Sequence, residues 1–120
     1  MMAHELLRQA ALILAAGWSK GAAARNAAGS IVPLFAGTAR ASINPEAVAF
    51  SPYAAICKAA SLNPGTRLTA KRVGGTVHPL RDINELEDVT TSELVALLNE
   101  AADMIDPANT EPRTAAGSLD

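Results

Sequence analysis

The sequence has a single cysteine, Cys57, so no disulfide can form within the chain. At 120 residues we expect one domain, large enough to bury a core without disulfide or metal support. The lack of disulfides is typical of a reducing compartment, and the N-terminal residues do not follow the pattern of a secretory signal. No apolar run approaches the length of a membrane span. We therefore expect a cytoplasmic protein that does not associate with membranes.

Aromatic residues are also scarce. The only four are Trp18, Phe35, Phe50 and Tyr53. Much of the 49% hydrophobic content is alanine, which buries little area but has the highest helix propensity. The composition therefore predicts a mostly helical domain with close helix packing and modest stability.

Motifs for catalysis, metal binding and phosphate binding are missing as well. The glycines match neither the dinucleotide-binding fingerprint nor the P-loop, and His4 and His78 lack the paired spacing of structural metal ligands. Cys57 falls in the middle of a predicted helix, which favours a buried structural role over an activated thiolate. The acidic residues between 82 and 88 are interpreted as solvated groups ahead of a helix. We therefore expect a protein that is not an enzyme and that binds no metal or cofactor. A minor alternative is an enzyme in which the fold brings Cys57, His78 and Asn84 together as a catalytic site.

Three segments carry a helical pattern. The first spans residues 5–16, and we expect Gly17 to end it in a left-handed conformation. The second, 52–61, follows a Ser-Pro start signal, and the third begins at a capping box of Thr90 and Glu93. The predicted buried stripes are Tyr53, Ile56, Cys57 and Ala60 on the second helix, and Leu94, Leu97, Leu98, Ala101 and Ile105 on the third.

The gaps between these helices carry turn signals. Around the turn at Asn26, residues 22–25 and 30–32 are predicted to pair as a short hairpin, with a helical turn over the alanines 22–24 as the alternative. In segment 66–80, a Gly-Gly pair between β-branched residues favours a hairpin, and a short helix over 66–72 is the alternative.

The predicted fold is thus mainly α. It has three principal helices with one or two short β-hairpins or irregular loops between them. Residues 1–106 are expected to form a single helical domain, and residues 107–120 a flexible, disordered acidic tail, because that end is rich in small and polar residues.

The charges are divided unevenly along the chain. Residues 1–81 contain nine Lys or Arg and two acids, a formal charge of +7, whereas residues 82–120 contain ten acids and one base, a formal charge of −9. Such asymmetry is typical of an acidic tail or of a nucleic-acid surface. The simpler interpretation is that the acidic last helix lies against the basic body.

Candidate binding residues come from two basic stretches and the only tryptophan. We expect Trp18 to be a packing anchor that forms the wall of a groove where the first helix ends. Segment 58–81 contains no acid, which is compatible with phosphate contacts, but it shows no recognition-helix pattern and no aromatic platform. The candidates are Trp18, Lys20, Arg25, Arg67, Lys71 and Arg72. The leading hypothesis is a non-enzymatic interaction protein that binds a host protein; the alternative is a nucleic-acid-binding protein using segment 58–81.

Three stretches share their order with a known family. They are GWSKG (17–21) with ARNAAG (24–29), NPEAV (44–48) with Cys57, and INE (83–85) with Thr90 and Glu93. This order resembles an uncharacterised bacterial and phage family of small helical proteins classed as a domain of unknown function, over residues 5–105. The resemblance implies a helical accessory protein of a phage or mobile element. In family members the cysteine lies nearer the start of the second helix, and an aromatic residue often stands where this chain has Ile83. The resemblance therefore does not imply a shared pocket.

Overall fold

The computed structural model describes residues 2–32, 41–77 and 88–108. Over these residues the fold is mainly helical, as predicted. Its helices are α1 (Ala3–Ala16), α3 (Pro52–Ser61), α4 (Arg67–Val77) and α6 (Thr91–Ile105), and its strands are β1 (Ala24–Arg25) and β2 (Ala49–Phe50). The predicted tail lies outside the described residues from position 109 onward.

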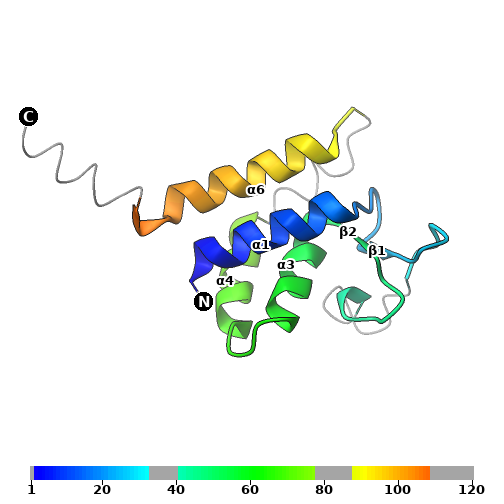
Figure 1. Ribbon diagram of the computed structural model, residues 1–120, viewed down its shortest axis with the longest axis horizontal. Helices are drawn as coiled ribbons and strands as arrows, with labels where there is room; N and C mark the ends of the chain where they lie inside the picture. The colour runs from blue at the N-terminus through cyan, green and yellow to red at the C-terminus, as the bar shows by residue number, and fades with distance from the viewer. Residues whose placement is uncertain (1, 33–40, 78–87, 109–120) are drawn as a thin grey trace, which may run out of the picture.

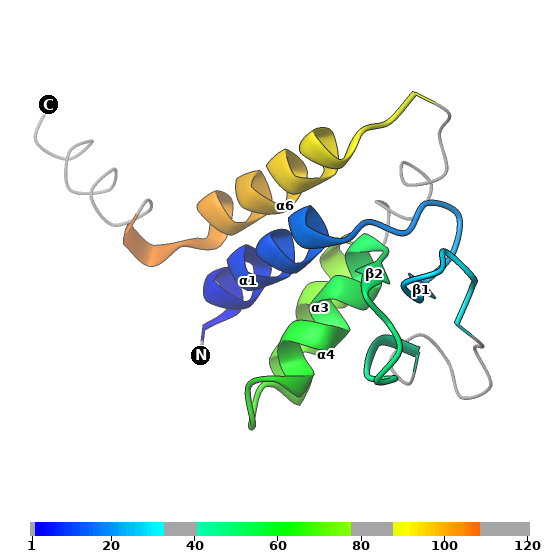
Figure 2. The same ribbon diagram turned by 45° about the vertical axis from the view of Figure 1, so that its right-hand side comes forward.

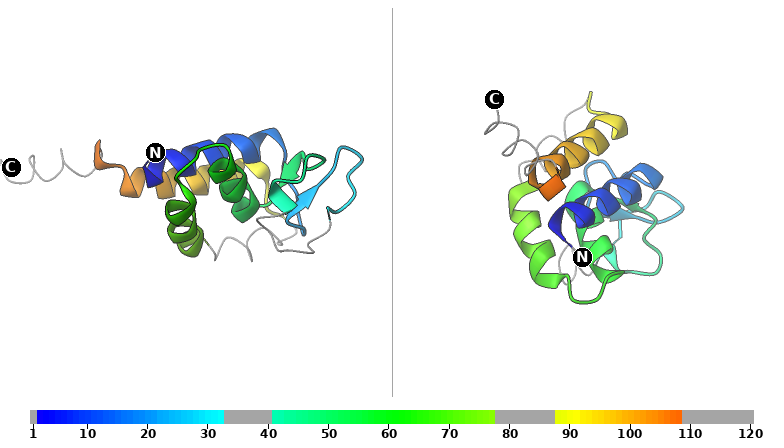
Figure 3. Two further views of the ribbon diagram at one scale, coloured as in Figure 1. Left: turned by 90° about the horizontal axis from the view of Figure 1, so that it is seen from below. Right: turned by 60° about the vertical axis from the view of Figure 1, so that its left-hand side comes forward.

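α1 lies in the middle of the molecule. α6 runs along one side of it, and α3 and α4 pack on the other side (Figures 1 and 2). The strands lie beyond the C-terminal end of α1, away from α4 (Figure 3). α1 can hold this central position because its apolar face is wide enough to cover neighbours on two sides.

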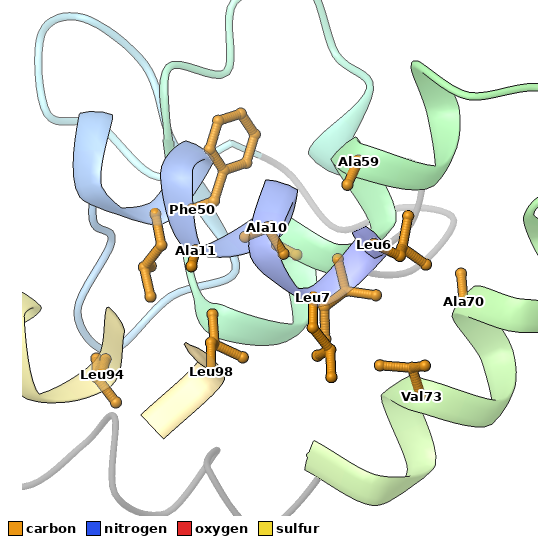
Figure 4. Packing of buried hydrophobic residues seen from close by; sticks show 14 of the residues in the cluster. Leu6, Leu7, Ala10, Ala11, Phe50, Ala59, Ala70, Val73, Leu94 and Leu98 are labelled. Atoms are coloured by element: carbon orange, nitrogen blue, oxygen red, sulfur yellow. The ribbon is translucent and has the colours of Figure 1, made fainter. Parts of the chain in front are cut away.

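The core is built mainly from small and aliphatic side chains of these four helices, and Phe50 of β2 joins it (Figure 4). α1 supplies Leu6, Leu7, Ala10, Ala11 and Leu14; α6 supplies Leu94, Leu98 and Ala102; α3 and α4 add Ile56, Ala59, Ala70 and Val73. Full burial of one leucine contributes about 2 kcal/mol, whereas the alanines mainly allow the helices to approach closely.

The starts of α3 and α6 were predicted correctly, whereas α1 begins at Ala3, two residues before the predicted start. Ser51 caps α3 by accepting a hydrogen bond from the Ala54 N–H at 3.3 Å. At α6, the Thr90 hydroxyl accepts from the Glu93 N–H, and the Glu93 carboxylate accepts from the Thr90 N–H, each at 3.2 Å. The capping box is therefore confirmed, and α3 spans the predicted residues 52–61.

The predicted role of Gly17 is wrong. Its φ is −165°, which is extended backbone and not the left-handed region. Glycine is required here because there is no room for a side chain: a Cβ at position 17 would collide with the carbonyl oxygen of Val48. β2 therefore passes directly over the end of α1, and its hydrogen bonds hold it there: the Phe50 N–H donates to the Gly17 carbonyl at 2.8 Å.

The predicted buried stripe of α3 is correct at Ile56, which is fully buried, but wrong at Tyr53. Tyr53 is 38% exposed and Cys57 is only partly buried. The fully buried residues include Ala55, Ile56 and Ala59. α3 packs against both α1 and α4, and an alanine-rich face lets two neighbouring helices approach more closely than a face with tyrosine would.

Segment 66–80 does not form the favoured hairpin. Residues 67–77 form the helix α4, so the alternative over 66–72 was correct in type but too short. Each glycine inside a helix costs about 1 kcal/mol relative to alanine. The buried Ala70 and Val73 of this helix pack into the core, and this burial favours the helix over the hairpin.

Residues 22–32 pair largely as predicted. Arg25 and Ile31 form an antiparallel bridge, and the Val32 N–H donates to the Ala24 carbonyl at 2.9 Å. The partner that was not predicted is β2, which pairs antiparallel with β1 in the register Ala24–Phe50 and Arg25–Ala49. The result is a small sheet whose strands come from distant parts of the chain.

Candidate functional site

Arg25 holds together the turns that follow α1. Its Nη1 donates to the Gly29 carbonyl at 2.9 Å, and its Nη2 donates to the Lys20 carbonyl at 3.0 Å. The guanidinium thus joins the loop before β1 to the turn after it. These contacts assign Arg25 a structural role in the sheet, beside the binding role predicted from the sequence.

The turn after β1 is rigid for a second reason. The Asn26 carboxamide oxygen accepts hydrogen bonds from the N–H groups of Ala28 at 3.0 Å and Ser30 at 2.9 Å. Gly29 adopts a φ of +84°, a left-handed conformation that favours glycine. The turn signal in the sequence was therefore read correctly, and Ile31 leaves the turn in a defined position.

Trp18 packs partly buried against the core, as expected for an anchor. The Lys20 Nζ lies 5.9 Å from the centroid of the Trp18 ring, within the usual range of a cation–π contact. The backbone of Trp18 also forms an isolated parallel β-bridge with that of Phe50. Three of the six candidate residues, Trp18, Lys20 and Arg25, are therefore brought together at the C-terminal end of α1.

Large aliphatic side chains are exposed beside this cluster. Ile31 is 58% exposed and Val48 is 51% exposed. Both lie next to Arg25: Ile31 bridges with it on one side, and the Val48 N–H donates to its carbonyl at 2.9 Å on the other. We name Ile31 and Val48 the ribbon surface. The sequence reasoning missed it because nothing in the sequence shows that these two aliphatic side chains stay exposed.

The other three candidates lie on α4. Lys71 and Arg72 are exposed, and Arg67 is the first residue of the helix. α4 packs near the N-terminal half of α1, whereas β1, the strand of Arg25, lies beyond the C-terminal end of α1 (Figure 1). Trp18 follows that end by two residues. The structure therefore separates the six candidates into two sites.

The surroundings of Cys57 favour the neutral thiol over the thiolate. Burial raises the pKa of its thiol, and a hydrogen bond with Tyr53 opposes only part of that shift. The pKa of the Tyr53 hydroxyl is raised as well, chiefly by the nearby Cys57. His78 and Asn84, the proposed companions of Cys57, lie outside the described residues, so the catalytic hypothesis stays a prediction.

The acidic end of α6 lies against the body of the protein, as the charge pattern suggested. Arg8 Nη2 lies 2.7 Å from Asp103 Oδ1 and 3.1 Å from Asp106 Oδ2. His4 Nε2 lies 3.8 Å from Asp106 Oδ1. The pKa of Asp106 is lowered, first by the backbone N–H of Ala108 and then by Arg8. The partner is thus an arginine of α1, which the sequence reasoning had not named.

Within residues 2–32, 41–77 and 88–108, no three His, Cys, Asp or Glu side chains lie close enough together to hold a metal ion. Within the same part of the chain, no helix combines the length and apolarity that crossing a bilayer requires.

Comparison with protein-family models, curated proteins and solved structures finds no match to this chain. The resemblance to the helical bacterial and phage family therefore stays a prediction. Functional inference depends on the two sites themselves.

Proposed function

We propose that this chain is a non-enzymatic interaction protein, an accessory protein of phage or mobile-element type that binds a host protein in the cytoplasm. The proposed contact is the ribbon surface formed by Ile31 and Val48. The observation that supports it is the exposure of these two aliphatic side chains on backbone that is fixed from both sides by Arg25.

Covering the ribbon surface would be favourable for two reasons. Burial of apolar area contributes about 25 cal/mol per Å², and Ile31 and Val48 together still expose much of theirs. The backbone is held by the Asn26 turn and by the Arg25 hydrogen bonds, so a partner would spend little free energy on ordering it. Arginine is itself enriched at protein interfaces, and Arg25 lies between the two aliphatic residues.

The test is site-specific photo-crosslinking in a bacterial host lysate. A photoreactive residue at Val48 should capture one defined protein, and Ile31→Asp should abolish that capture. Leu12 provides the matched control, because it is 72% exposed on the outer face of α1. Leu12→Asp should leave the capture unchanged, and a crosslinker at Leu12 should not yield the same protein.

Two results would contradict the proposal. One is an equal loss of capture in Ile31→Asp and Leu12→Asp, since this would mean that the captured protein binds exposed apolar side chains non-specifically. The other is steady-state turnover by the purified protein that a conservative change at a single polar residue abolishes. Circular dichroism of both variants separates loss of binding from loss of fold.

A further inference from the structure

We draw no further inference here: the strongest candidate, the outer edge of the small sheet at Ile31, carries nothing, because a single residue presents its N–H and C=O groups there, residues 33–40 that follow Val32 lie outside the described part of the chain, and nothing in the structure shows what would pair with this edge.

Discussion

Replacing Gly17 with alanine tests the packing of β2 over the end of α1. At an extended φ of −165°, alanine has no backbone strain. In open space, the change from glycine would stabilise a protein by about 0.4–1 kcal/mol, because it restricts the unfolded chain. Here the new Cβ would collide with the Val48 carbonyl oxygen, which is backbone and cannot rotate away. We therefore expect Gly17→Ala to destabilise the protein.

The size of this loss follows from what must move. Forcing an extra methyl group into a packed site typically costs about 1–3 kcal/mol. Moving β2 away also strains two hydrogen bonds, from the Phe50 N–H to the Gly17 carbonyl at 2.8 Å and from the Ser19 N–H to the Phe50 carbonyl at 2.9 Å. Each is worth about 1 kcal/mol. The expected loss is about 2–4 kcal/mol, a large part of the stability of about 5–15 kcal/mol usual for a domain.

Urea unfolding followed by Trp18 fluorescence and by circular dichroism measures this loss. With a urea m-value of about 1–3 kcal/mol/M, the midpoint should fall by roughly 1–2 M. Gly17→Asn distinguishes the two explanations of this glycine. Asparagine tolerates the left-handed conformation better than alanine, so a helix-ending role would make Gly17→Asn the milder change. If the collision with the Val48 carbonyl oxygen is the reason for glycine, Gly17→Asn should lower the midpoint at least as much as Gly17→Ala does. An unchanged or higher midpoint for Gly17→Ala would refute the steric reasoning.

Three further changes test the helices and the ion pairs. Thr90→Ala should cost about 1 kcal/mol in thermal or urea unfolding, because the Glu93 N–H loses its cap. Leu98→Ala should cost about 2–5 kcal/mol in the same measurements, because Leu98 is fully buried between α6 and α1. The pKa of Asp106 is lowered in the folded state, so its contribution is present above the unfolded-state pKa and is lost as pH falls through the folded one. Asp106→Asn should therefore flatten the decline of stability below about pH 4, measured by unfolding across a pH series.

The starts of α3 and α6 were predictable because their chemistry is local. A side-chain oxygen at Ser51 or Thr90 needs only a backbone N–H three residues away, and both partners are adjacent in the sequence. The same holds for the Asn26 turn, in which one carboxamide satisfies two nearby N–H groups. Local competition between side chain and backbone determines these features, and it needs no knowledge of the rest of the fold.

The faces of the helices were less predictable because they depend on partners that are distant in the sequence. On α3, hydrophobicity favoured the stripe with Tyr53 and Cys57, yet the buried face is the alanine-rich one with Ala55 and Ala59. A helix packed between two neighbours needs small side chains, and the sequence does not show how many neighbours a helix has. The role of Gly17 was hidden for the same reason, since β2 lies about thirty residues further along the chain.

The candidate site shows the same limit, with a consequence for function. Arg25 and Lys71 look equivalent in the sequence, as cations near glycines. The structure uses the Arg25 guanidinium to bind two backbone carbonyls, whereas Lys71 stands exposed on a helix that the sequence had not clearly predicted. Whether segment 66–80 is a hairpin or a helix decides where its charges lie. The packing of Ala70 and Val73 into the core favours the helix, and that packing depends on residues distant in the sequence.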